Sequence, residues 1–195
     1  GLTSFSADQP FRVASVSKMF AAVALVRLIP DRLDQDISPI LGFDLRHPAF
    51  PDRPITTRMI LSHTSGLRNG DSYPVPFSHA LSEAFRPDGR HFDSGSWFGP
   101  PNHAPGDWFT YADVNFALAA QMVERLTGER FDLHVRRVLF APGGLDIGYN
   151  WSGVSARRRA RAAAGLRREN GAWQAQVDES PPAFPQIALY RGDDP

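Results

Sequence analysis

The stretch F-R-V-A-S-V-S-K-M-F-A-A-V-A-L-V-R-L-I, residues 11–29, decides the fold. From Ser15 to Ile29 almost every position is apolar, which predicts a helix with hardly any polar face, central to the core. Pro30 ends this helix, because proline has no amide hydrogen to donate. Since Arg27 interrupts the run well short of the roughly 18 apolar residues that a membrane span needs, we expect a buried helix and no anchor.

Ser15 and Lys18 form an S-x-x-K pattern at the start of this helix. The three-residue spacing places both side chains on one helical face. The positive partial charge of the helix N-terminus, together with burial, would lower the lysine pKa and let the amine accept the serine proton. The same field would stabilise negative charge on an attacked carbonyl. Taken alone, the pattern also fits an N-cap serine followed by a surface lysine.

The composition supports a special role for Lys18. The chain has 21 basic residues, and Lys18 is the single lysine among them. Arginine keeps its proton in any protein setting, so only this amine is able to act as a base near neutral pH. The formal net charge of zero argues against a protein that grips nucleic acid along a broad basic face. The absence of cysteine excludes disulfides and thiol nucleophiles.

In the middle of the chain, segments rich in turn-forming residues alternate with segments rich in apolar residues. Residues 32–50 read as a loop with short turns. A second helix is expected from Thr56 or Thr57 as N-cap to a point near Gly66. Residues 68–110 combine many glycines and prolines with many aromatic residues, which predicts an ordered loop packed on the body of the protein.

Two further helices are expected in the second half, over residues 115–127, where Gly128 supplies the C-terminal cap, and over residues 130–140. Beyond residue 150 the pattern is weaker. Residues 155–168 suggest a basic helix, and the plausible strands are residues 171–177 and 187–190. Because no repeat or clear boundary is visible, we expect one domain over residues 1–195.

Three blocks of sequence together resemble a known family. They are F-R-V-A-S-V-S-K-M-F at 11–20, I-L-S-H-T-S-G-L at 60–67 and F-T-Y-A-D-V-N-F at 109–116, followed by L-T-G at 126–128. In order and separation they resemble the serine β-lactamase and penicillin-binding-protein family, in the branch of class C β-lactamases, D-alanyl-D-alanine carboxypeptidases and family VIII esterases. The resemblance covers roughly residues 10–150. It implies an α+β fold, a helical region against an antiparallel sheet, of which this chain covers mainly the helical part.

The resemblance also implies a role for individual residues. Ser15 would form an acyl-enzyme and Lys18 would take its proton. Tyr111 would share the role of base and protonate the leaving group, provided that nearby positive charge lowers its pKa from about 10. The alternative for Tyr111 is a half-buried aromatic side chain that precedes a helix. No cofactor is implied, and no paired metal-ligand spacing such as H-E-x-x-H occurs.

Asp113 departs from the family pattern, which usually has asparagine at this position. An amide both donates and accepts hydrogen bonds, whereas a carboxylate only accepts them and repels an anionic substrate group. Asp113 would also favour a charged Lys18. We therefore expect it to contact substrate and to favour neutral esters or amides over penicillins. The structural alternative is that Asp113 caps the helix starting at Val114, and both roles are compatible.

The family's third motif, Lys-Thr-Gly or His-x-Gly on an edge strand, is missing. No lysine follows Lys18 and no histidine follows His134 in this sequence. The resemblance places this motif beside the oxyanion site, and family members are considerably longer. We expect an incomplete β-lactamase-like domain, that is, a fragment, a truncated homologue or a chain with further parts. The H-T-S-G at 63–66 is expected to belong to the second helix.

Three functional hypotheses remain open. The first is a serine hydrolase that acts through an acyl-enzyme on a small ester, a D-amino-acid peptide or a β-lactam. The second is a non-catalytic protein of the same fold that binds peptidoglycan or a partner. The third is a nucleic-acid binder with a basic helix, which a solvated helix face explains better; the basic residues concerned are Arg157, Arg158, Arg159, Arg161, Arg167 and Arg168.

Trp97 and Trp108 lie in the aromatic loop and are candidates for the wall of an acyl-binding pocket, with simple packing as the alternative. The expected partner is a small-molecule substrate, with no nucleic acid and no membrane span, and the oligomeric state is open. Most of the family is periplasmic or secreted, and a cytoplasmic location is also compatible with the sequence.

Overall fold

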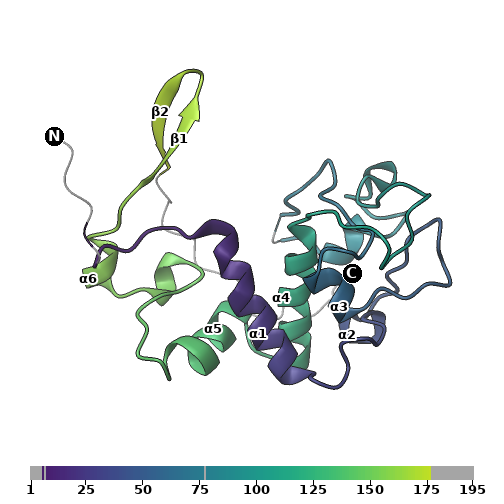
Figure 1. Cartoon of the computed structure of the whole chain (residues 1–195), viewed down its shortest axis with the longest axis horizontal. Coiled ribbons are helices and arrows are strands. Elements are labelled where there is room, and N and C mark those ends of the chain that lie inside the picture. The colour runs from purple at the N-terminus through teal and green to yellow at the C-terminus, as the bar shows by residue number, and fades with distance from the viewer. Residues whose placement is uncertain (1–5, 7, 77, 177–195) are drawn as a thin grey trace. The chain divides into compact units, whose positions relative to one another are not determined.

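The computed structural model describes residues 6, 8–76 and 78–176 (Figure 1). Contacts group these residues into two compact units. The first contains the N-terminal residues up to Met19 and the described residues from Asp132 onward, and the second runs from Phe20 to Phe131.

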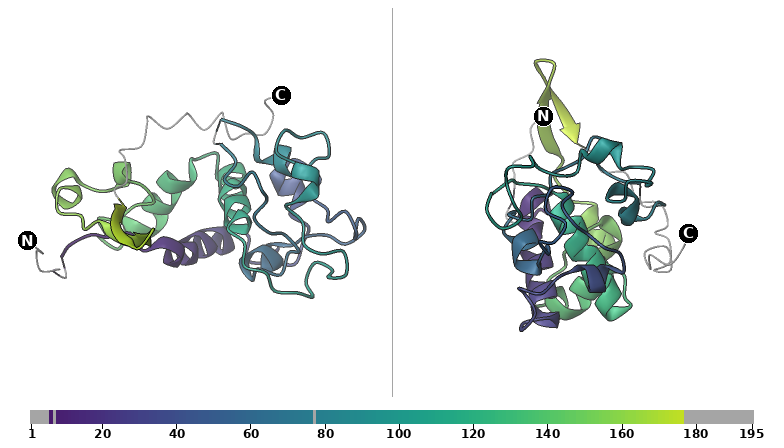
Figure 2. Two further views of the ribbon diagram at one scale, coloured as in Figure 1. Left: turned by 90° about the horizontal axis from the view of Figure 1, so that it is seen from above. Right: turned by 90° about the vertical axis from the view of Figure 1, so that its right-hand side faces the viewer.

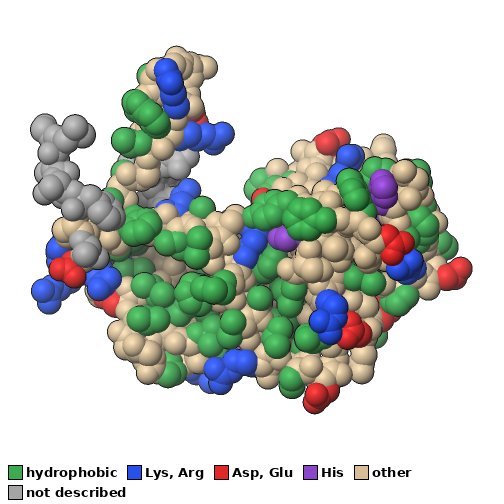
Figure 3. Space-filling model, viewed as in Figure 1, with side chains coloured by type: hydrophobic (Ala, Val, Ile, Leu, Met, Phe, Trp, Pro, Cys, Tyr) green, Lys and Arg blue, Asp and Glu red, His purple; other side chains and the backbone are tan. Residues whose placement is uncertain are grey.

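The expected N-terminal helix is present as two elements. A 3-10 turn, η1 (Ala14–Ser17), leads into the α-helix α1 (Lys18–Leu28). The expectation that this helix is central to the core is right for one face only. Ala21, Ala24 and Leu25 are buried, whereas Val16 and Met19 are 60% and 57% exposed. Figure 3 shows green hydrophobic side chains at the surface in this part of the chain.

The second unit is built around α4 (Val114–Thr127), against which α2 (Ser38–Leu41) and α3 (Thr57–Leu61) pack (Figure 1). Val114, Leu118 and Met122 are fully buried. Their four-residue spacing places them on one face of the helix, which is why this face forms the core. The helix ends at Gly128 in a left-handed conformation, with φ of 68°. The predicted helix over 115–127 and its glycine cap are therefore confirmed.

The second predicted helix begins where expected and ends earlier. The Thr56 hydroxyl accepts a hydrogen bond from the Met59 amide at 3.3 Å, which confirms the predicted N-cap. The helix α3 stops at Leu61, so the expectation that it continues to Gly66 was wrong. The cause is the backbone of His63 and Gly66, whose φ angles of 57° and 77° are incompatible with a right-handed helix. The H-T-S-G segment therefore forms a turn after the helix.

The described residues of the aromatic loop, 68–76 and 78–110, are packed as predicted. It contains two short 3-10 turns, η2 (Leu81–Ala84) and η3 (Asp93–Gly95). Trp97 is fully buried, and its indole nitrogen donates a hydrogen bond to the His91 carbonyl at 2.6 Å. A side chain on Gly70 would place its Cβ atom 2.4 Å from the Trp97 ring. The loop therefore has a core of its own, centred on Trp97.

His47 attaches this loop to the body of the second unit. Its Nε2 donates to the Gly99 carbonyl at 3.1 Å, and its Nδ1 accepts from the Ala49 amide at 3.2 Å. These two contacts require a neutral ring that carries its proton on Nε2. Burial lowers the pKa of His47, and the hydrogen bond to Gly99 opposes this effect only in part. The loop is thus held by a histidine that is uncharged at neutral pH.

The helical part of the first unit begins with α5 (Phe131–Val135), which continues as a π-helical turn, η4 (Arg136–Phe140). These two elements confirm the helix predicted over residues 130–140. The short turn η5 (Trp151–Gly153) and the helix α6 (Ala156–Arg159) follow.

The first unit ends in an antiparallel hairpin of β1 (Gly165–Glu169) and β2 (Ala172–Gln176). The hairpin stands away from α5 and α6 of its own unit (Figures 1 and 2). The basic helix predicted over 155–168 was wrong beyond Arg159. Asn170 and Gly171 both have positive φ, 49° and 83°, and this Asn-Gly pair forms the hairpin turn. The strand predicted over 171–177 is confirmed for its described residues, and that over 187–190 lies outside them.

The fold of the described residues is therefore mostly helical with a small antiparallel sheet, which agrees with the expected helical part of an α+β protein. None of the helices in the described ranges combines the length and apolar character that crossing a membrane requires.

The substitution Trp97→Phe tests the core of the aromatic loop. It removes part of a buried ring and leaves the His91 carbonyl without its donor, so we expect the free energy of unfolding to fall by about 2–3 kcal/mol. Trp173→Phe is the matched control, because Trp173 is 67% exposed on β2 and the same change there should cost less than about 0.5 kcal/mol. Urea denaturation measures both, and equal losses would contradict the assigned packing.

Candidate active site

The start of α1 brings Ser15 and Lys18 together. The Lys18 Nζ atom donates a hydrogen bond to the Ser15 Oγ atom at 3.0 Å. Ser15 is exposed and Lys18 is half-buried as a whole residue, and the hydrogen bond between the two side chains lies in an exposed position. When the amine is neutral, the same contact lets the hydroxyl donate to Nζ, which is the geometry for proton transfer from serine to lysine.

The backbone before Ser15 is bent into an unusual conformation. Ala14 has a φ of 45°, in the left-handed region that costs an L-residue about 1–2 kcal/mol. Ser15 then occupies η1, directly before the eleven-residue helix α1. The positive end of the α1 dipole therefore faces the region of the Ser15 side chain, where it favours developing negative charge.

Two contacts from the C-terminal half of the first unit support this turn. The Tyr149 hydroxyl donates to the Ser17 carbonyl at 2.6 Å, and the Tyr149 ring stacks on Phe140 with centroids 6.4 Å apart. The Ala163 amide donates to the Pro10 carbonyl at 2.8 Å. The sequence analysis did not identify Tyr149, because a contact that spans 132 residues leaves no local pattern.

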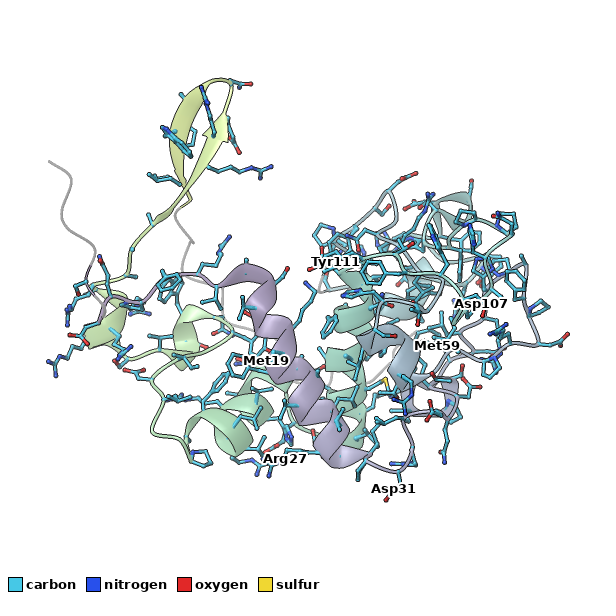
Figure 4. The ribbon with its side chains drawn as sticks, in the orientation of Figure 1. Met19, Arg27, Asp31, Met59, Asp107 and Tyr111 are labelled. Carbon is cyan, nitrogen blue, oxygen red and sulfur yellow. The ribbon has the colours of Figure 1, made fainter. Side chains whose placement is uncertain are left out.

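Tyr111 lies in the second unit, just before α4, and is 49% exposed (Figure 4). Its ring packs against the His63 ring, with centroids 4.4 Å apart and planes inclined by 32°. His63 itself is buried. Tyr111 is thus a half-exposed side chain that packs on a buried histidine, and no sequence pattern had marked His63 as part of the site.

Asp113 occupies the N-cap position of α4, as the structural alternative expected, yet its carboxylate makes no capping hydrogen bond. Asn69 takes over this function, since its Oδ1 accepts from the Val114 amide at 3.1 Å. The Nδ2 of Asn69 donates to the Asp113 carboxylate at 3.3 Å. The predicted N-cap position of Asp113 is therefore confirmed, while the side-chain hydrogen bond of the cap comes from Asn69, 45 residues away from Val114.

The two candidate pocket tryptophans have different surroundings. Trp97 is fully buried in the core of the aromatic loop, which favours the packing alternative for this residue. Trp108 is half-buried and stacks on His103, with centroids 4.7 Å apart and planes inclined by 18°. Trp108 therefore keeps exposed ring surface in the second unit.

The candidate site thus consists of two groups of residues. Ser15 and Lys18 are in direct contact in the first unit, and Tyr111 and Asp113 flank the start of α4 in the second. Within the described ranges, no three histidine or acidic side chains gather in a way that would hold a metal ion.

A family model described as Beta-lactamase matches residues 3–184. The chain belongs to the beta-lactamase family. Among curated relatives, penicillin-binding protein 4* of Bacillus subtilis (strain 168) is 26% identical over 148 residues, which is 70% of this chain and 29% of that protein. This beta-lactamase-family chain is thus also similar to penicillin-binding proteins.

Solved structures share the fold. Simvastatin synthase (LovD) from Aspergillus terreus matches with a TM-score of 0.63 and 22% identity, over 92% of this chain and 48% of that one. D-amino acid amidase from Ochrobactrum anthropi SV3 matches with a TM-score of 0.61 and 24% identity, over 87% of this chain and 47% of that one. The expected β-lactamase/transpeptidase-like fold is confirmed. The beta-lactamase-family chain spans less than half the length of each of these relatives.

Substitutions of Asn69 and Asp113 test which side chain caps α4. We expect Asn69→Ala to lower the free energy of unfolding by about 1 kcal/mol, because the Val114 amide loses its acceptor. In about 1 M salt, Asp113→Ala should lower the free energy of unfolding by less than Asn69→Ala does, because the salt screens the interaction of the Asp113 charge with the helix dipole. Urea denaturation of both variants, with Asn102→Ala as a surface control, measures the difference. A larger loss for Asp113→Ala would reverse the assignment.

Proposed function

We propose that this protein is a serine hydrolase that forms an acyl-enzyme on Ser15, with small neutral esters as the preferred substrates. The observation that carries the proposal is the 3.0 Å contact between the Lys18 amine and the Ser15 hydroxyl at the start of α1. A serine hydroxyl is a weak nucleophile until a nearby base accepts its proton. Lys18 is the one side-chain amine in the sequence, and it lies within reach of that proton.

The reaction would proceed in two steps. In the first, Ser15 Oγ attacks the ester carbonyl carbon while its proton passes to the neutral Lys18 amine, and the C–O bond to the leaving alcohol then breaks. The leaving oxygen takes a proton from the Tyr111 hydroxyl, which Lys18 then reprotonates. In the second step, water attacks the acyl carbon, and the acid departs as Ser15 regains its proton. The net change is hydrolysis of one ester by one water molecule.

Tyr111 enters this mechanism through the family pattern and its surroundings. Its half-exposed side chain and its packing on the His63 ring suit a group that has to meet substrate in a fixed direction. The proposal requires that Tyr111 and Ser15 act on the same bound substrate. A proton carried by Lys18 would favour the ionised phenol, because opposite charges lower the cost of ionisation.

Asp113 decides the order of the proposed substrates. Its carboxylate would repel the carboxylate of a β-lactam or of a D-alanyl peptide, and an amide at this position would not. Neutral esters therefore come first, and amides without a carboxylate come second. The similar D-amino acid amidase was solved in complex with L-phenylalanine amide, a compound of this second kind.

Asp113 also motivates a second candidate function, in which the chain keeps the fold and binds peptidoglycan or a protein partner without turnover. A carboxylate beside the reacting centre favours the charged form of Lys18, and a charged amine is no base. The two candidates differ in the reactivity of Ser15.

A fluorophosphonate probe tests the nucleophile. We expect intact mass spectrometry of the labelled protein to show one adduct, which peptide mapping places on Ser15, because the phosphorus traps an activated serine. Ser15→Ala should abolish labelling, and Ser17→Ala should label at a rate within about twofold of the unmodified protein, because it removes a hydroxyl from the same turn.

Lys18→Arg keeps the positive charge and removes the base, since a guanidinium does not release its proton. We expect this variant to label about 10²–10⁴ times more slowly. An adduct that persists in Ser15→Ala would refute the mechanism. A folded protein whose Ser15 stays unlabelled while it binds peptidoglycan would support the non-catalytic alternative.

A further inference from the structure

We infer that His63 is a positioning residue that fixes the orientation of Tyr111. The inference deepens the proposed function, because it names what holds the proposed proton donor in place. His63 is 9% exposed and makes contacts to both the backbone and the ring of the segment around Tyr111.

The backbone contacts bracket Tyr111 on both sides. The Thr110 amide donates to the His63 carbonyl at 2.8 Å. The Ala112 amide donates to the His63 Nδ1 atom at 3.2 Å. One residue thus binds the amides directly before and after Tyr111, and this leaves the Tyr111 backbone little freedom to rotate.

The ring contacts restrict the side chain in addition. The His63 ring lies 4.4 Å from the Tyr111 ring, and Phe116 and Phe109 pack on His63 at 5.4 Å and 6.0 Å. Centroid separations in this range are favourable for aromatic pairs, by about 0.5–1.5 kcal/mol beyond the burial of area. The Tyr111 ring therefore packs on the buried His63 ring, while Tyr111 itself remains 49% exposed.

A buried polar chain fixes the proton on the His63 ring. The Ser65 hydroxyl donates to Asn115 Oδ1 at 2.7 Å, which turns the amide nitrogen of Asn115 toward His63. That nitrogen donates to His63 Nδ1 at 3.3 Å, alongside the Ala112 amide. Because two donors face Nδ1, this atom carries no proton, and the neutral ring keeps its N–H on Nε2. Ser65 and Asn115 are fully buried, so water does not compete.

The conformation of His63 explains how one residue makes all these contacts. Its φ of 57° is in the left-handed region, which turns the carbonyl and the ring toward the same neighbouring segment. Asparagine tolerates this region, and its Oδ1 atom lies near the position of a histidine Nδ1. Phenylalanine keeps a ring and lacks the acceptor. His63→Asn therefore keeps an acceptor for the Ala112 amide and loses the ring contact with Tyr111. His63→Phe keeps the ring contact and loses the acceptor.

The experiment uses the full chain with 3-fluorotyrosine in place of tyrosine, and assigns the Tyr111 fluorine signal by its loss in Tyr111→Phe. We expect both His63 variants to shift the Tyr111 signal and to lower kcat for the preferred ester about 10–100-fold, with KM within about twofold. The same substitutions at His79, which stacks on His91 in the aromatic loop, are the controls and should leave kcat and the Tyr111 signal unchanged. Titration of reactive Ser15 with the fluorophosphonate gives the concentration of folded, reactive protein, and a lower kcat per reactive Ser15 separates positioning from a loss of folded protein.

The outcomes distinguish this inference from the proposed function. An unmoved Tyr111 signal in folded His63 variants overturns the inference, whether or not the protein has activity. A shifted signal in a protein whose Ser15 does not react supports the contact and rejects the hydrolase. Ring ¹⁵N shifts of the unmodified protein give a test without variants, because the inference requires a bare Nδ1 on His63, and a protonated Nδ1 overturns it.

Discussion

In the proposed mechanism the start of α1 has to meet two opposed requirements, since Ser15 must reach a substrate while the Lys18 amine must be able to lose its proton. The exposure of Ser15 suits the first requirement, and the intermediate burial of Lys18 with its 3.0 Å contact to the Ser15 hydroxyl suits the second. The apolar helix makes this possible, because three buried side chains, Ala21, Ala24 and Leu25, fix its axis. Tyr149 adds a hydrogen bond to the turn that carries the serine. The remaining chemistry depends on this turn keeping its shape.

The second unit supports the proposed proton donor in a different manner. Tyr111 has no regular structure of its own and stands immediately before α4. Its support comes from the turn that interrupts the chain after α3, where His63 takes a left-handed backbone. Ser65 and Asn115 hold the His63 ring in one protonation state through buried hydrogen bonds. Buried polar groups of this kind are stable when they are paired, and the Ser65 hydroxyl, the Asn115 amide and His63 Nδ1 are paired with one another.

The sequence predicted the parts of the site that depend on local spacing. Ser15 and Lys18 are three residues apart, so helical geometry alone brings them together. Val114 to Thr127 has a strong apolar period, and its helix was predicted to within one residue. Asn69, His63 and Tyr149 were missed because each acts on a partner between 45 and 132 residues away, and pattern analysis does not detect such contacts. The Asn170-Gly171 pair was a local signal for a hairpin that the arginine-rich context obscured.

The Asp113 carboxylate lies at the start of α4, two residues after Tyr111. The carboxylate accepts from Asn69, whose other amide atom caps α4, so the charge is held beside the start of the helix near Tyr111. In the proposed mechanism such a charge would favour neutral substrates and would make deprotonation of Lys18 harder. The proposed hydrolase therefore depends on Tyr111 to share the proton transfer with Lys18.

The central claim is that Ser15, Lys18 and Tyr111 act on one reacting centre. The most direct measurement is a crystal structure of the protein after reaction with a fluorophosphonate. The account predicts phosphorus bonded to Ser15 Oγ, with Lys18 Nζ and the Tyr111 hydroxyl each within about 3 Å of an adduct oxygen. A phosphorus atom on another residue, or an adduct on Ser15 with the Tyr111 hydroxyl beyond hydrogen-bonding distance, would contradict it.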